Sequence, residues 1–215
     1  MSPPRPLTRP KLLPRSFYRR DPVDLAPLLL NKLIAVSDGR SARIVEVEAY
    51  RGTTDPASHA FRGRTASNAT MFGRPGRLYV YRSYGLHWCA NVVAGHPPAD
   101  GVPFEAGAVL LRAGEPVGGI EQMRSARWRT QLSQRDLDLC RGPGRLCQAL
   151  GVDGPCDGLD LARPGSAVVL LDDGTPPPLR PSASPRVGVS AGVDLPWRFA
   201  LAGHPYVSGP RPAAP

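Results

Sequence analysis

The stretch Arg43-Ile-Val-Glu-Val-Glu-Ala-Tyr50 decides the fold class of this chain. Apolar and polar residues alternate along it with a period of two, which is the pattern of a β-strand with two different faces. The residues that we expect on one face are Val45, Val47 and Ala49. Those that we expect on the opposite face are Glu46, Glu48 and Tyr50. The strand therefore presents a carboxylate and an aromatic ring side by side.

Further strand-like segments surround this stretch, and turns rather than long helices join them. The expected strands are 78–81, 88–93, 108–112, 168–171, 187–190 and 198–201. The expected helices are 22–33, 115–127 and 145–150. Asp38-Gly39, just before the first strand, is a typical hairpin turn. Hairpin-linked strands with few helices predict an α+β fold, built around a mainly antiparallel curved β-sheet with a few flanking helices.

The two ends of the chain differ in composition from its middle. Residues 1–20 are rich in Pro and Arg and have almost no apolar periodicity, which predicts a mobile basic arm. Residues 209–215 read as a Pro-rich tail. We find no internal repeat and no convincing linker between these ends, so residues 21–208 are expected to form one compact domain.

The composition is that of a globular protein with an excess of positive charge. Of 215 residues, 41% are hydrophobic and 21% charged, and the formal net charge is +9. Only Lys11 and Lys32 are lysines, so nearly all cations are arginines, which suit phosphate. A GC-rich genome explains part of this excess, so composition alone supports nucleic-acid binding only weakly. No apolar run is long enough to span a bilayer and no signal core is present. We expect a soluble cytoplasmic protein, associated with the nucleoid if bacterial.

Metal, nucleotide and cofactor motifs are absent from the sequence. The four cysteines form no Cys-x-x-Cys pair, and the four histidines form no His-x-x-x-His unit. No phosphate-binding Gly-x-x-x-x-Gly-Lys loop is present either. We therefore expect no metal and no cofactor, and we interpret the cysteines as reduced core residues.

Aromatic residues gather after the first strand. Four of the six tyrosines fall between residues 50 and 84, and residues 51–76 form a long loop that carries His59. Loops of that length inside a compact domain are usually functional. Aromatic side chains can stack on an unpaired base, but Tyr79 and Tyr81 could equally pack in a core, and a lone strand glutamate is most often a solvated charge.

Seven strings between Asp24 and Ser208 resemble the alkyladenine (3-methyladenine) DNA glycosylase family. They are 43–50, 55–59, 68–72, 78–85, 89–91, 109–113 and 142–150. Several long strings in the right order are much more specific than one short motif. The resemblance covers most of the chain and implies a single compact α+β domain, which agrees with the expectation from periodicity.

The resemblance also implies roles for individual residues. Glu48 would activate the attacking water, with Arg112 and the backbone carbonyl of Val187 helping to hold it. Tyr84 would enter the duplex where a nucleotide has left. The residues that would bind the flipped base are Tyr50, His59 and Tyr81 around it and Asn91 on the pocket floor.

The implied chemistry is reasonable on physical grounds. An N-alkylated purine is positively charged and leaves easily, so one carboxylate can both deprotonate water and face the developing charge at C1′. Strand cleavage generally needs an amine, and both lysines lie before the catalytic strand. We expect a monofunctional enzyme that acts as a monomer on duplex DNA with damaged purines. A non-catalytic binding module and a nucleoside hydrolase are the alternatives.

Several other charged residues have more than one interpretation. Glu46 shares the face of Glu48, and we interpret it as a structural or solvated charge because one water-activating base needs no partner acid. Arginines are plausible phosphate contacts, although any of them could be a solvated surface residue. The candidates for phosphate binding are Arg64, Arg77, Arg82, Arg141 and Arg145.

Overall fold

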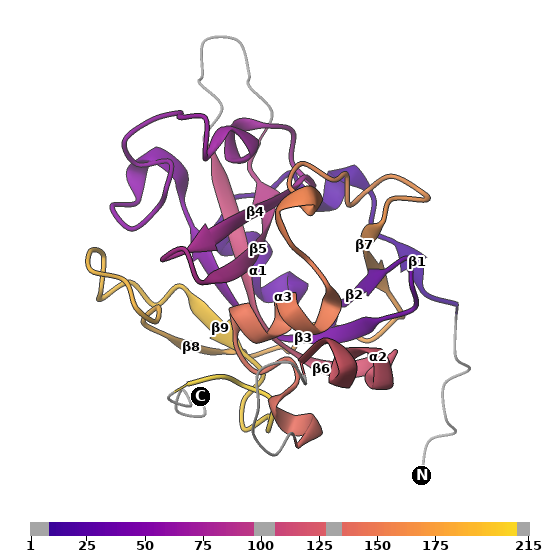
Figure 1. The fold of residues 1–215 in the computed structure, drawn as a ribbon. Coiled ribbons are helices and arrows are strands. Elements are labelled where there is room, and N and C mark those ends of the chain that lie inside the picture. The colour runs from indigo at the N-terminus through magenta and orange to yellow at the C-terminus, as the bar shows by residue number, and fades with distance from the viewer. Residues whose placement is uncertain (1–8, 97–105, 128–134, 210–215) are drawn as a thin grey trace.

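A computed structural model describes residues 9–96, 106–127 and 135–209 of the chain (Figure 1). Within these residues one antiparallel sheet of nine strands curls into a half-barrel, and three α-helices accompany it. The expectation of a single α+β domain around a mainly antiparallel curved sheet is confirmed. The Pro-rich tail beyond Gly209 lies outside the described residues.

The sheet is built around one central strand, β3. The strands are β1 (Lys11–Leu12), β2 (Leu33–Val36), β3 (Ser41–Tyr50), β4 (Leu78–Ser83), β5 (His87–Ala94), β6 (Gly107–Gly118), β7 (Val168–Asp172), β8 (Ser182–Ser184) and β9 (Arg198–Ala200). The main order is β1-β7-β2-β3-β6-β5-β4, with β9 also paired to β3 and β8 paired to β9. Strand β3 thus has β2, β6 and β9 as partners along its length.

A β-bulge interrupts the alternation that the sequence predicts in β3. The pairing with β6 shifts between Ile44 and Val47, so Val45 leaves the face shared by Val47 and Ala49. Ile44 packs with Val47 and Ala49 in the main core, whereas Val45 packs in a smaller cluster that includes Val207. The prediction of one face for all three apolar residues is therefore wrong for Val45. An extra residue at a bulge locally reverses the period-two pattern.

The helices are α1 (Pro22–Leu29), α2 (Ile120–Arg127) and α3 (Pro143–Leu150). Helices α1 and α3 supply leucines to the core that also holds Val109 and Leu111 of β6. The Asp21 side chain caps α1 by accepting the backbone N–H of Val23 at 2.8 Å. In Figure 1, α2 and α3 lie in front of the sheet.

Some element boundaries differ from those expected. Helix α1 ends at Leu29 rather than residue 33, so Lys32 precedes β2 instead of standing in the helix. Residues 115–118 continue β6, and α2 begins only after Gly119, whose φ is +66°. Residues 187–190 form bends and not a strand, because Gly188 has a φ of +76°.

The prediction of a mobile arm over residues 1–20 is wrong for the second half of this segment, which belongs to the folded domain. Lys11 and Leu12 pair with β7 as strand β1, and Arg15 forms an ion pair with Asp160. Tyr18 is completely buried in the main core. Two-residue strands and isolated aromatics leave no periodic signal, which is why the sequence pattern misses them. The first eight residues lie outside the described part of the chain.

The cysteines and helices also bear on the sequence expectations. All four cysteines are free, and three of them are buried, as expected of core thiols. None of the helices in the described residues is long and apolar enough to cross a membrane. Within the same residues, no group of three or more His, Cys, Asp or Glu side chains is placed to hold a metal ion.

Tyr18→Ala tests whether residues 11–20 belong to the domain. Loss of this buried ring should lower the free energy of unfolding by about 3–5 kcal/mol, measured by urea denaturation. Tyr18→Phe is the matched control, because the buried hydroxyl has no hydrogen-bond partner among the described residues. A loss below about 0.5 kcal/mol for Tyr18→Ala, typical of a surface position, would show that the segment is not part of the core.

Candidate active site

Side chains alternate between the two faces of the sheet along four adjacent strands. One face packs in the core, and the opposite face lines a cavity. In β6, Val109 and Leu111 enter the core, whereas Leu110 and Arg112 line the cavity. The same division holds in the neighbouring strands. The residues that face the cavity there are Glu48 and Tyr50 of β3, Tyr79 and Tyr81 of β4, and Cys89 and Asn91 of β5. The sheet is thus two-sided because its side chains alternate with period two.

The cavity has a volume of about 550 Å³, which is within the range of small-molecule sites. Beyond the sheet, one loop with His59 and another with Val187 to Ser190 line it, together with Met71, Tyr84 and Pro143. The structure therefore brings together all eight residues for which the sequence predicts a role in catalysis, base binding or intercalation. They are Glu48, Tyr50, His59, Tyr81, Tyr84, Asn91, Arg112 and Val187.

Glu48 is a fully buried carboxylate that donors hold from three directions. The backbone N–H of Val187 donates to Oε1 at 2.7 Å, and Arg112 Nη1 lies 3.2 Å from the same oxygen. The Tyr50 hydroxyl donates to Oε2 at 3.0 Å. Hydrogen bonds and an adjacent cation offset the cost of burying the charge. Glu48 is therefore fixed in one orientation at the edge of the cavity.

Arg112 connects Glu48 to a second buried carboxylate, Glu46. Its Nε donates to Glu46 Oε1 at 2.9 Å, and Arg198 Nε donates to the same oxygen at 2.7 Å. Burial lowers the pKa of Arg112, but the charges of Glu48 and Glu46 outweigh this and raise it. Of the two interpretations of Glu46, the structural one is correct, since its side chain is completely buried.

Three aromatic rings form one wall of the cavity. The rings of Tyr79 and Tyr81 stack with centroids 5.5 Å apart, and His59 meets Tyr81 edge-on at 4.4 Å. His59 Nδ1 lies 3.1 Å from the Tyr79 hydroxyl. Burial raises the pKa of Tyr79 to about 12, so its hydroxyl keeps its proton. Burial also lowers the pKa of His59 from 6.5, which leaves the imidazole neutral at pH 7.

The floor of the cavity is an ordered row of β-sheet partners. Glu48 pairs with Leu110, Leu110 with Asn91, and Asn91 with Tyr79. The amide nitrogen of Asn91 donates to the carbonyl oxygens of Tyr79 at 3.1 Å and Cys89 at 3.4 Å. With its nitrogen engaged by the backbone, Asn91 has its carbonyl oxygen left to accept a hydrogen bond.

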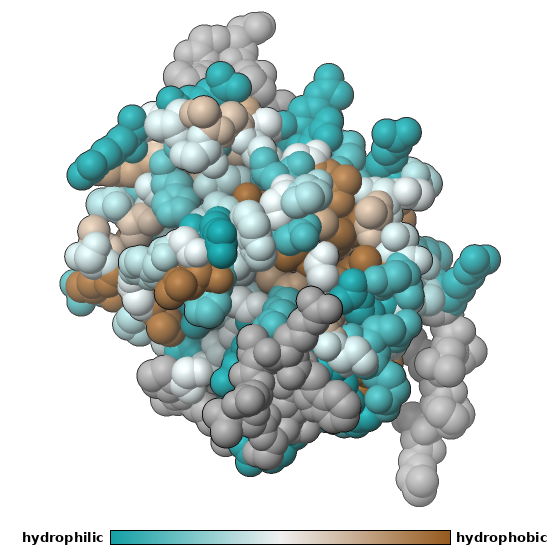
Figure 2. Space-filling view, in the orientation of Figure 1, coloured by the Kyte–Doolittle hydropathy of each residue, from teal (hydrophilic) through white to brown (hydrophobic). Residues whose placement is uncertain are grey.

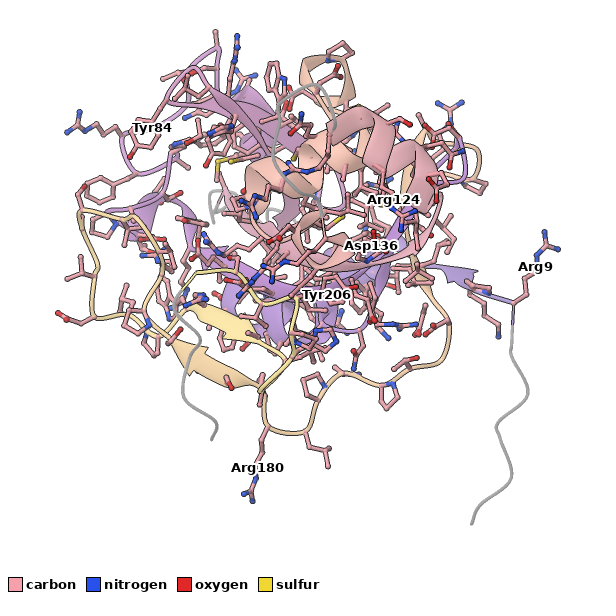
Figure 3. All side chains as sticks on the ribbon, turned by 60° about the horizontal axis from the view of Figure 1, so that its bottom comes forward. Arg9, Tyr84, Arg124, Asp136, Arg180 and Tyr206 are labelled. Carbon is pink, nitrogen blue, oxygen red and sulfur yellow. The ribbon has the colours of Figure 1, made fainter. Side chains whose placement is uncertain are left out.

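Tyr84 is at the tip of the β4–β5 hairpin, at the outer edge of the molecule (Figure 3). Its side chain is 90% exposed and its φ is +49°, an uncommon backbone conformation for a large residue. Leu86, also on this tip, is 70% exposed. Figure 2 shows that apolar patches on the visible face are small and scattered over a largely hydrophilic surface. An exposed apolar tip beside a polar cavity is a candidate contact surface.

The buried pair of Arg186 and Asp55 fastens the two loops to β3 from behind the cavity. Arg186 Nη2 donates to Asp55 Oδ1 at 2.9 Å, and the guanidinium lies 4.7 Å from the centre of the Tyr50 ring. Asp55 also accepts the backbone N–H groups of Arg51 and Ala57, which shapes the chain before His59. The sequence analysis missed this pair, although Asp55 begins one of the seven strings, because nothing local signals a contact over 131 residues.

The five arginines expected to contact phosphate are in different surroundings. Arg64 and Arg82 are exposed, and Arg82 lines the cavity with its guanidinium 5.7 Å from the Trp88 ring. Arg77 instead donates to the carbonyl of Gly158 at 2.7 Å. Arg141 and Arg145 line a neighbouring cavity of about 870 Å³, where they bind the Val207 carbonyl and Asp138. The phosphate-binding role stays a prediction for all five.

Neither lysine lies near these groups. Lys32 forms an ion pair with Asp172 at 2.9 Å, and Lys11 is in β1. Among the described residues, those that line the cavity include no lysine. The cavity therefore offers a carboxylate, tyrosines and a neutral histidine, but no amine side chain from this part of the chain.

Comparison with known proteins gives a consistent class. Residues 16–205 match the family model described as methylpurine-DNA glycosylase. A protein of Burkholderia lata named "Putative 3-methyladenine DNA glycosylase" is 52% identical over 93% of this chain and 92% of its own. Proteins with the same name from Granulibacter bethesdensis and Agrobacterium fabrum are each 44% identical, over 93% and 91% of this chain and 88% and 92% of theirs.

The cavity and these matches define a DNA repair enzyme that acts on alkylated purines. The chain belongs to the methylpurine-DNA glycosylase family.

Asp55→Asn tests the pair behind the cavity. Both partners are completely buried, so loss of one charge should lower the free energy of unfolding by about 3–5 kcal/mol. The matched control is Asp38→Asn, which removes a carboxylate that is 47% exposed from its ion pair with Arg40 and should cost less than about 1 kcal/mol. Chemical denaturation of both variants makes the measurement. Equal losses in the two variants would contradict the assignment.

Proposed function

We propose that the protein is a monofunctional DNA glycosylase of base excision repair. It takes an alkylated purine of the 3-methyladenine type out of duplex DNA and hydrolyses the N-glycosidic bond with a water that Glu48 activates, leaving an abasic site. Its class, DNA-3-methyladenine glycosylase, follows from its family and its relatives. The mechanism rests on the cavity. One observation carries it: a fixed carboxylate stands beside an aromatic slot, next to an exposed aromatic tip.

Glu48 has the environment that a general base for water needs. Arg112, Val187 N–H and the Tyr50 hydroxyl orient it, and its buried side chain lines the cavity. A water between Glu48 and the sugar would lose its proton to the carboxylate as its oxygen attacks C1′. Until the proton is transferred, the negative charge of Glu48 faces the positive charge that develops on the sugar. The carbonyl of Val187 is the proposed further ligand of this water.

The aromatic wall favours an electron-poor purine. Tyr50, His59 and Tyr81 would enclose the base, and their rings attract a cationic base by cation–π interaction. A neutral His59 adds no repulsion to a positively charged base at pH 7. The carbonyl oxygen of Asn91 would accept a hydrogen bond from an amino group of the base on the floor. A methylated purine therefore gains more from this slot than an ordinary one.

The tip at Tyr84 supports duplex DNA as the substrate. The glycosidic bond of a stacked nucleotide is out of reach, so the nucleotide must leave the helix at a cost of a few kcal/mol. An exposed aromatic side chain inserted into the gap favours the extruded state. Arg82 beside the cavity, with exposed Arg64, would contact phosphates, and one monomer carries every residue of this scheme.

Glu48→Gln tests the catalytic assignment. Base release from a methylated duplex should fall by about 10²- to 10⁴-fold under single-turnover conditions, because the amide cannot accept the proton of water. The matched control is Glu121→Gln on α2, whose side chain is 81% exposed and should leave the rate unchanged. Release by Glu48→Gln at the rate of the unmodified protein would refute the mechanism.

We also predict that the protein does not cleave the DNA strand. The purified protein should release free base and leave an intact strand with an abasic site, because the described cavity has no lysine to form a Schiff base. The measurement is denaturing gel electrophoresis with and without alkali, together with borohydride treatment. A covalent protein–DNA complex trapped by borohydride would overturn the monofunctional assignment.

A further inference from the structure

The inference concerns Glu46, a buried carboxylate that does not line the cavity. Its Oε1 accepts hydrogen bonds from Arg112 and Arg198, and its Oε2 accepts the backbone N–H of Ser208 at 2.6 Å. All of its hydrogen-bond partners belong to the protein interior. Glu46 is therefore not a candidate for contact with substrate, and its effect on the reaction must pass through its neighbours.

Arg112 is the neighbour that reaches the active site. Its three guanidinium nitrogens have three different partners: Nε bonds Glu46, Nη1 lies beside Glu48, and Nη2 donates to the hydroxyl of Ser208 at 3.3 Å. A planar guanidinium held at two other points cannot turn away from Glu48. The position of the cation against the catalytic carboxylate is thus set by Glu46 and Ser208.

Arg198 completes the arrangement from β9. It donates through Nε to Glu46 and through Nη2 to the carbonyl of Ser208 at 2.6 Å. Ser208 therefore takes part through its N–H, its carbonyl and its hydroxyl. It follows the region matched by the family model, which ends at residue 205. The end of the described chain is thus tied to the active site.

The four side chains Glu46, Glu48, Arg112 and Arg198 make a buried group with no net charge. The other ionisable groups around Glu48 are neutral or paired. Burial raises the pKa values of Tyr50, Tyr81 and Cys89, so they stay protonated, and His59 is neutral at pH 7. Arg186 is paired with Asp55. Removing one member of the group therefore leaves one uncompensated charge near Glu48.

We propose that Glu46 is a positioning residue for the reaction: with Arg198 and Ser208 it holds Arg112 against Glu48, and it balances the buried charge around the catalytic carboxylate. This inference rests on the proposed function, because it takes Glu48 as the base. It gives Glu46 and Arg198 opposite effects on the pH dependence of base release, which a role in folding alone would not produce.

The test is the pH profile of single-turnover base release by Glu46→Gln, Arg198→Met and Arg198→Lys. Glu46→Gln leaves an extra positive charge, which favours the ionised form of Glu48. The acid limb of the profile, over which the rate rises with pH, therefore moves to lower pH. Arg198→Met leaves an extra negative charge, so the limb moves to higher pH. Each shift should be about one pH unit. The maximal rate should fall about 10- to 100-fold because Arg112 is less well placed, while duplex affinity stays within about twofold.

Arg198→Lys separates charge from geometry. It keeps the charge but cannot reach both Glu46 and the Ser208 carbonyl, so its maximal rate should fall with the acid limb unchanged. A variant that lacks a cooperative thermal transition does not fold. If this is the case for Glu46→Gln or Arg198→Met, the test is made with Arg198→Lys alone. Glu121→Gln is the matched control on the surface.

The outcomes distinguish the inference from the proposed function. Acid limbs that stay in place or move in the same direction in Glu46→Gln and Arg198→Met overturn the inference, as does a wild-type rate in Arg198→Lys. In those cases a fall of release by about 10²- to 10⁴-fold in Glu48→Gln would leave the proposed function standing. Unchanged release in Glu48→Gln would instead refute the proposed mechanism, in which Glu48 is the base.

Discussion

A buried carboxylate must be matched by donors and by positive charge, and the structure around Glu48 is organised by this requirement. The ionised group would be too costly to bury alone. β3 therefore lies between β6, which brings Arg112, and β9, which brings Arg198, while the bend after Arg186 brings the N–H of Val187. The same contacts that make burial possible also orient the carboxylate toward the cavity.

The two-sided sheet is what makes such a site compatible with a stable fold. Leucines of α1 and α3 cover one side of β6, and the cavity occupies the other side. Burial of the apolar side provides the main stabilisation, at roughly 25 cal/mol per Å² of apolar surface. The polar side can then hold ionised groups in fixed positions. Along each strand, the residues that face the core provide stability, and the residues between them face the cavity and serve the function.

The fold class follows from local patterns in the sequence, whereas most residues of the cavity are expected only from the family resemblance. Alternation in 43–50 and the tyrosines near Tyr81 place their side chains on defined strand faces. The bulge at Val45 is not predictable in this way, since it arises from pairing with β6. Arg198 and Ser208 give no local signal either, because they meet Glu46 only after the sheet has formed.

The bend at Val187 and the N-terminal segment differ from expectation for related reasons. Val187 belongs to an apolar run that resembles a strand, but its N–H binds Glu48 instead of a neighbouring strand. The Pro- and Arg-rich segment before Asp21 resembles an arm, yet β1 pairs with β7 and the ring of Tyr18 lies in the core. In each case long-range contacts outweigh the local composition.

The most direct test of the account is a crystal structure of Glu48→Gln bound to a duplex that carries one methylated purine. We expect the purine outside the helix, between Tyr50, His59 and Tyr81, with its C1′ facing the side chain at position 48. Tyr84 should occupy the gap that the nucleotide leaves in the duplex. A purine that remains stacked in the helix, with the cavity empty in the complex, would contradict the central claim.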